Sequence, residues 1–99
     1  MLLVKIHKSY RNVVAICDSD LLGKKFEEGD MQLDLTGEFF NGEGLSKEEV
    51  LSILEEGKTE DATFNIVGDA AIQLALKAGV IQEGGIKTVE GVPIALTLL

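Results

Sequence analysis

The sequence has few of the residues from which catalytic and metal sites are usually built. It holds one cysteine, Cys17, and one histidine, His7, among 99 residues. A single cysteine excludes an internal disulfide, and a lone thiol is typical of a reducing compartment. Zinc and related metals need several His or Cys ligands, which this chain does not supply. We therefore expect a cytoplasmic protein without a transition-metal site, and no sequence motif calls for a cofactor.

Long apolar segments are also missing. No run approaches the roughly 18 apolar residues that a membrane helix needs. Lys5 interrupts the apolar start of the chain, so the chain also lacks the apolar run of a secretion signal there. We expect no membrane association. Hydrophobic residues make up 45% and charged residues 26% of the chain, which is ordinary globular usage and argues against disorder. At this length, residues 1–99 are expected to form one domain.

Basic residues are scarce, because nine lysines and arginines stand against 17 aspartates and glutamates, for a net charge of −8. This balance argues against a surface that coats DNA. The charges are unevenly distributed, however, since residues 1–25 hold five of the nine basic residues and two of the 17 acidic ones. Such an asymmetry is typical of a local contact patch on an acidic body. Chance, together with the demands of solubility, is the simpler alternative.

Strand patterns dominate the first third of the chain. Residues 2–8 and 13–17 predict two strands joined by a polar turn, an N-terminal β-hairpin. The polar residues 18–20 are typical helix N-caps and predict a short helix over 21–26. A period-two alternation of apolar and polar residues then predicts a half-buried strand over 31–36.

A helix follows after a glycine-rich loop. Ser46 and Glu49 have the spacing of a capping box, and Leu45 and Val50 stand where a hydrophobic staple would place them. Gly57 is expected to end this helix in the left-handed conformation.

The C-terminal half predicts a strand–helix–strand arrangement. A strand over 63–67 is followed by a mostly apolar helix over 70–78 and by closing strands over 86–89 and 92–98. Pro93 cannot donate a backbone hydrogen bond, so the last strand should be an edge strand or begin with a bulge. The chain thus predicts an α/β fold of the mixed α+β type. Its parts are an N-terminal β-hairpin, a mixed sheet with two main helices packed on it, and a right-handed crossover between any parallel strands.

Four fragments, taken in their order and spacing, resemble a known family. They are Lys5-Ile6-His7-Lys8, the run from Cys17 through Leu22-Gly23-Lys24-Lys25-Phe26-Glu27-Glu28-Gly29, Asn65-Ile66-Val67-Gly68, and Gly91-Val92-Pro93. Together they resemble a small archaeal family, domain of unknown function 424, over most of the chain. The resemblance implies an archaeal, cytosolic, single-domain protein and brings no reaction or site residue. A histidine often follows the proline in the family, whereas this sequence has Ile94, so a role for that histidine does not apply here.

The obvious catalytic pair is Cys17 with His7, because an imidazole next to a thiol activates a cysteine nucleophile. A four-residue hairpin turn would place Cys17 opposite Val4, and strand alternation then puts the thiol and the imidazole on different faces of the sheet. A register shifted by one residue would remove this argument. We interpret Cys17 as a core residue and His7 as a surface residue, and we assign no catalytic residue.

One aspartate pattern partly matches a calcium-binding loop. Asp18, Asp20 and Gly23 occupy its first, third and sixth positions. The fifth position is Leu22, however, and Gly29 stands where a bidentate glutamate is required. The match therefore fails, and we predict no metal site.

The turn from the 63–67 strand into the next helix offers one candidate small-ligand site. In this geometry an anion can bind at the helix N-terminus. The segment has one glycine and no Lys-Ser/Thr pair, so it matches neither a dinucleotide fingerprint nor a P-loop. Its Asp69 would repel phosphate, and a plain turn with Asp69 as the helix N-cap is the simpler interpretation. A small-molecule-binding protein or enzyme with a site at Asn65, Gly68 and Asp69 is our second hypothesis.

Two surface features favour instead a non-enzymatic binding module with a macromolecular partner. The first is the basic N-terminal hairpin, whose cations and aromatic ring suit RNA phosphates and bases; an ordinary solvated hairpin is the alternative. The second is the Phe39-Phe40 pair, in which one ring would enter the core and the other would anchor a protein partner, unless both are buried. The candidate residues are Lys5, His7, Lys8, Tyr10, Arg11, Lys24, Lys25, Phe39 and Phe40. The expected partner is RNA, a ribonucleoprotein or a protein, and the sequence leaves the oligomeric state open.

Overall fold

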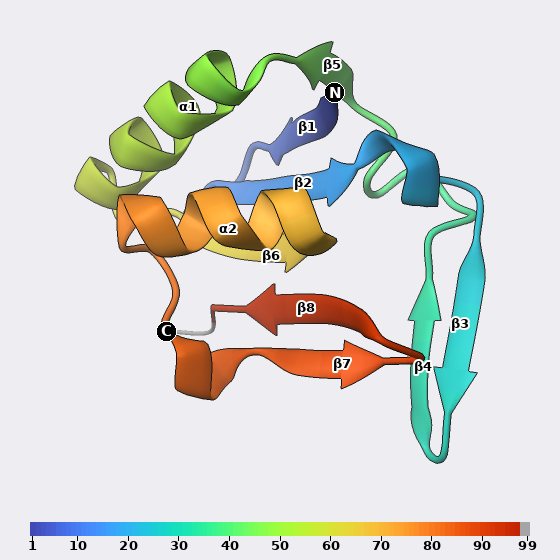
Figure 1. The fold of residues 1–99 in the computed structure, drawn as a ribbon. Helices are drawn as coiled ribbons and strands as arrows, with labels where there is room; N and C mark the ends of the chain where they lie inside the picture. The colour runs from blue at the N-terminus through green and yellow to red at the C-terminus, as the bar shows by residue number, and fades with distance from the viewer. Residues whose placement is uncertain (98–99) are drawn as a thin grey trace.

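The computed structural model describes residues 1–97 as a six-stranded sheet, a separate two-stranded hairpin and two main helices (Figure 1). The strands of the sheet, in spatial order, are β5 (Glu43–Leu45), β1 (Leu2–His7), β2 (Val13–Asp18), β6 (Thr63–Val67), β8 (Val92–Leu96) and β7 (Lys87–Val89). The hairpin consists of β3 (Lys25–Glu28) and β4 (Met31–Asp34), and the main helices are α1 (Lys47–Thr59) and α2 (Asp69–Ala78). The predicted mixed α+β class is confirmed.

The order and pairing of the elements confirm the N-terminal hairpin and the strand–helix–strand arrangement of the C-terminal half, which is β6–α2–β7. β1 and β2 pair antiparallel, whereas β2 and β6 form a parallel pair. β7 follows α2 along the chain but does not join β6, because β8 lies between them and pairs antiparallel with both. The parallel pair therefore joins the N-terminal hairpin to the second half of the chain.

The prediction that Pro93 marks an edge strand or a bulge was wrong, because β8 is an interior strand. Its ladder with β6 ends where Val67 pairs with Ile94. Pro93 lies one residue beyond, and its carbonyl accepts a hydrogen bond from the Gly68 N–H at 2.9 Å. The missing proline N–H thus falls outside the ladder that β8 forms with β6. The predicted end of this strand at Leu98 lies outside the described residues.

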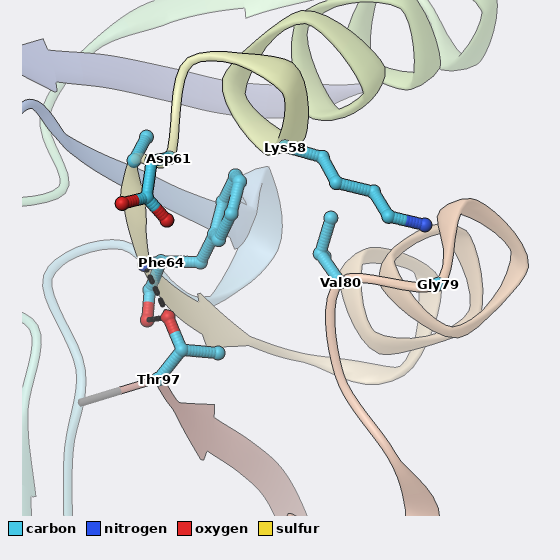
Figure 2. Close-up of a pocket in the computed structure, with 7 residues that line it drawn as sticks. Lys58, Asp61, Phe64, Gly79, Val80 and Thr97 are labelled. Carbon is cyan, nitrogen blue, oxygen red and sulfur yellow. Dashed lines mark hydrogen bonds between the residues drawn. The ribbon is translucent and has the colours of Figure 1, made fainter. Parts of the chain in front are cut away.

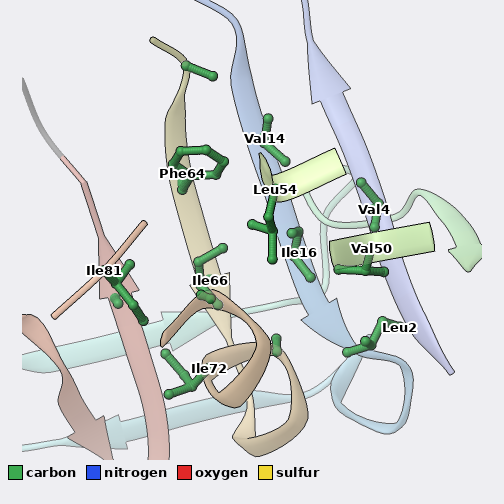
Figure 3. Packing of buried hydrophobic residues seen from close by; sticks show 14 residues of the cluster. Leu2, Val4, Val14, Ile16, Val50, Leu54, Phe64, Ile66, Ile72 and Ile81 are labelled. Atoms are coloured by element: carbon green, nitrogen blue, oxygen red, sulfur yellow. The ribbon is translucent and has the colours of Figure 1, made fainter. Parts of the chain in front are cut away.

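Both helices cover one face of the main sheet, which we call the helix face (Figure 1). Val50 and Leu54 of α1 and Ile72 of α2 pack against Ile16 and Ile66 in the middle of the sheet, and Figure 3 shows these side chains meeting in a single layer. Burial of one such side chain stabilises the fold by about 1.5–3 kcal/mol.

The capping box predicted for α1 is confirmed, whereas the predicted end of the helix was wrong. The Ser46 hydroxyl accepts a hydrogen bond from the Glu49 N–H, and the Glu49 carboxylate accepts one from the Ser46 N–H. Gly57 does not end the helix, which continues to Thr59. A Cβ on Gly57 would lie 3.0 Å from the Phe64 ring, so this glycine lets α1 pack closely on β6.

The helix predicted over 21–26 is absent, since a short 3-10 turn at Ser19–Leu21 leads into strand β3. Gly29, with φ +61, turns the chain into β4, and the predicted alternating strand is confirmed there. Its Leu33 pairs with Phe26 of β3, and Leu33 and Leu35 are buried against the sheet face opposite the helices. The hairpin stands across the ends of β7 and β8 (Figure 1).

Candidate functional site

The sheet face opposite the helices, which we call the hairpin face, is covered at one end only. At that end Leu33 of β4 and Leu35, which follows the strand, pack with the buried Cys17, Val67 and Val89. At the other end, none of the helices and hairpins within residues 1–97 lies over the strands, and the strand side chains named next are partly or fully exposed. We call this end the open face; its strand residues are Lys5, His7, Val13, Thr63, Asn65 and Leu96.

An aromatic stack borders the open face at β1. The rings of His7 and Phe39 lie parallel within 15°, with their centroids 4.3 Å apart. Nε2 of His7 also donates to the Phe39 carbonyl at 3.0 Å in the tautomer that carries the Nε2 proton. The Phe40 ring meets Phe39 edge-on and is 8% exposed, whereas Phe39 is 44% exposed. One ring of the pair therefore enters the core and the other faces solvent.

The loop that carries Phe39 is held on β1 by several contacts. Nζ of Lys5 donates to the Glu38 carbonyl at 3.0 Å, and the Glu38 carboxylate accepts from the Asn41 amide at 2.9 Å. Gly42 passes so close to β1 that a Cβ there would lie 2.1 Å from the Val4 carbonyl oxygen. This packing fixes the position of the exposed ring before any ligand arrives, which lowers the entropy lost on binding.

The structure brings some of the predicted binding residues together and separates others. Lys8 and the fully exposed Tyr10 follow His7 in the β1–β2 turn. Arg11 instead pairs with Asp61, to whose carbonyl its Nε also donates at 3.0 Å. The two lysines of the other hairpin, Lys24 and Lys25, do not join the group: β3 packs on β7, which β2, β6 and β8 separate from β1.

The register predicted for Cys17 was wrong by one residue. Cys17 pairs with Leu3, and His7 pairs with Val13, so the thiol and the imidazole share the hairpin face. They stand at opposite ends of the ladder, about 13 Å apart at the usual rise of about 3.3 Å per residue. Burial, with the nearby Asp18 and Asp20 carboxylates, raises the pKa of Cys17 to about 11. Distance and protonation therefore separate the pair, where we expected strand alternation to do so.

The N-terminus of α2 is already occupied by a carboxylate. Asp18, at the end of β2, accepts hydrogen bonds from the backbone N–H groups of Ala70 and Ala71 at 3.1 and 2.9 Å. A Cβ on Gly68 would lie 2.4 Å from this carboxylate, so the turn fits closely around it. Asp69 is the first helical residue, and the expectation that it caps the helix was wrong. Asn65, Gly68 and Asp69 do not converge, because Asn65 faces the open face from the middle of β6.

A cavity of about 180 Å³ opens between the C-terminal ends of α1 and α2 (Figure 2). Figure 2 shows the Lys58 side chain extended towards Gly79 and away from Asp61, which pairs with Arg11. The Thr97 hydroxyl is engaged with the Phe64 backbone, whose N–H donates to it at 2.7 Å. Asp61 and Thr97 thus serve neighbouring parts of the fold, and the Lys58 side chain points away from them.

Within residues 1–97, no three His, Cys, Asp or Glu side chains are grouped so as to hold a metal ion. None of the helices in that range is both long and apolar enough to span a bilayer.

Comparison with known proteins places the chain in a family. It is similar to a structure described as an uncharacterized conserved protein from Methanopyrus kandleri, with 25% sequence identity and a TM-score of 0.85 over 97% of this chain and 89% of that one. No curated protein matches the chain. A family model described as a protein of unknown function (DUF424) matches residues 7–98. The chain therefore belongs to the DUF424 family.

Proposed function

We propose that this protein is a non-enzymatic RNA-binding module of the archaeal cytosol that works through its open face. The observation that carries the proposal is the exposed His7–Phe39 stack, with Lys5 beside it and Lys8 following it in the chain. Flat aromatic rings stack on nucleobases, and lysines beside them attract phosphates. The buried free thiol of Cys17 is compatible with a reducing compartment.

The other candidate sites give less support to a small-molecule function. An anion at the N-terminus of α2 would have to displace the Asp18 carboxylate. In the cavity between the helix ends, Asp61 is paired with Arg11 and the Thr97 hydroxyl is bonded to the Phe64 backbone. The open face, with its fixed Phe39 ring, therefore supports a binding function better than either of these two sites.

The test is a titration of labelled single-stranded RNA, followed by fluorescence anisotropy at low and moderate salt. His7→Ala combined with Phe39→Ala removes the stack, and should weaken binding by about 5- to 150-fold if one base loses a contact of about 1–3 kcal/mol. Lys8→Glu should weaken binding more at low salt than at moderate salt.

Lys47→Glu on α1 is the matched control, because it makes the same charge change on the helix side and should leave binding nearly unchanged. Equal binding by the wild type, the double variant and both charge variants would contradict the proposal, as would a wild type that binds no RNA at either salt concentration.

A further inference from the structure

The hairpin face has an unusual composition for this chain. The protein carries 17 acidic residues, yet none of the residues that β1, β2, β6, β8 and β7 direct to this face is acidic. The register of the strands assigns the following residues to it: Leu3, Lys5, His7, Val13, Ala15, Cys17, Thr63, Asn65, Val67, Val92, Ile94, Leu96, Lys87 and Val89. The strands therefore contribute only neutral and positive side chains on a body with a net charge of −8, which favours a polyanion, while the loop held on β1 adds the Glu38 carboxylate.

The strand register also sets neighbouring side chains in a row across the open face. Lys5 pairs with Ala15, Ala15 with Asn65, and Asn65 with Leu96. Ala15 is fully buried, so the side chains of this row that reach solvent are those of Lys5, Asn65 and Leu96. Leu96, which is 55% exposed, closes the row on β8.

A hollow lies beyond this row, at the edge of the sheet opposite the aromatic stack. It has a volume of about 200 Å³ and is lined by Gly85, Lys87, Ile94 and Leu96. From β1 to β7 the face spans four strand spacings, or about 19 Å at about 4.8 Å each. Sheet platforms of comparable width in other RNA-binding folds take two or three bases.

We infer that the RNA lies as a single strand across β1, β2, β6 and β8, and this inference rests on the proposed function. One base stacks on Phe39 at the β1 end, the Asn65 amide hydrogen-bonds the edge of the next base, and a third nucleotide reaches the hollow, where Lys87 meets a phosphate. A duplex does not fit this arrangement, because its bases are already stacked and paired. Asn65 is thereby the specificity-determining residue, since an amide offers both a donor and an acceptor to a base edge.

The experiment compares short single-stranded RNA homopolymers with a duplex, for the wild type, Asn65→Ala, Lys87→Glu and the control Lys77→Glu on α2. Asn65→Ala should weaken the preferred homopolymer by about 5- to 150-fold and reduce the differences among homopolymers. Lys87→Glu should weaken all of them similarly and lower the salt dependence. Thermal unfolding of each variant checks that the fold is retained, and these partly or fully exposed sites should leave it intact.

The outcomes separate the two proposals. If the His7→Ala and Phe39→Ala double variant loses RNA affinity but Asn65→Ala and Lys87→Glu bind as the wild type does, the site is confined to β1 and the Phe39 loop. The inference then fails while the proposed function stands. Equal or tighter binding of the duplex also overturns the inference while the proposed function stands. If the wild type binds no RNA and instead captures a protein through this face, both proposals fail.

Discussion

The two faces of the main sheet are covered to different extents. The helix face is covered by α1 and α2, and its central residues, such as Ile16, Ile66 and Leu54, are fully buried. The hairpin face is closed at one end by β3 and β4 and left open at the other, where Lys5, His7 and Asn65 replace the apolar side chains. This difference indicates that stability is concentrated on the helix face, which leaves the open face free to carry polar and aromatic groups.

The largest difference in stability should come from comparing a leucine-to-alanine substitution on each of the two faces. Leu54→Ala removes a fully buried side chain from α1 and should lower the free energy of unfolding by about 2–5 kcal/mol. Leu96→Ala, at a leucine that is 55% exposed on the open face, should change it by less than about 0.5 kcal/mol. Urea unfolding measures both, and comparable losses at the two sites would break the distinction between the faces.

A smaller effect is expected where β2 is joined to α2. Asp18→Ala leaves the N–H groups of Ala70 and Ala71 without their acceptor, which should cost about 1–2 kcal/mol of stability. Asp20→Ala is the control, because it removes a nearby carboxylate that is exposed on the neighbouring 3-10 turn. Equal stability of the two variants in urea unfolding would show that the Asp18 cap contributes nothing.

The sequence pattern was sufficient for elements whose signals are local. The capping box at Ser46 and the end of α2 at Ala78 both depend on residues within one helical turn, and both were predicted correctly. The hairpin of β3 and β4 was missed because the polar residues 18–20 predicted a helix over 21–26. Its strand character comes from tertiary packing of Phe26 and Leu33 on the sheet.

The candidate site was predicted only in part, for the same reason. Lys5 and His7 were found from the local excess of basic residues, and Phe39 from an aromatic pair in a glycine-rich loop. The place of Asn65 beside Ala15 depends on the parallel pairing of β2 with β6, which joins segments far apart in the chain and leaves no local signal. The role of Asp18 at α2 was hidden for the same reason.

The smallest effect concerns the buried thiol under the closed end of the hairpin face. Because the pKa of Cys17 is raised from 9.0 to about 11, the unfolded chain loses this proton at a lower pH than the folded protein does. The stabilisation is complete below pH 9 and is lost as the pH rises towards 11, so the free energy of unfolding should fall across this range. Cys17→Ala should show a shallower fall in urea unfolding at a series of pH values. Identical pH profiles, or rapid modification of the native thiol at pH 8, would show that this end of the face is not closed.

The most direct test of the account is to map the RNA contact on ¹⁵N-labelled protein by NMR during a titration with single-stranded RNA. The account predicts that the amide shifts concentrate in β1, the loop around Phe39, β6 and β8, and that the exposed sides of α1 and α2 stay unchanged. Shifts centred on the helices, or on the cavity near Lys58, would contradict the assignment of the open face as the working surface.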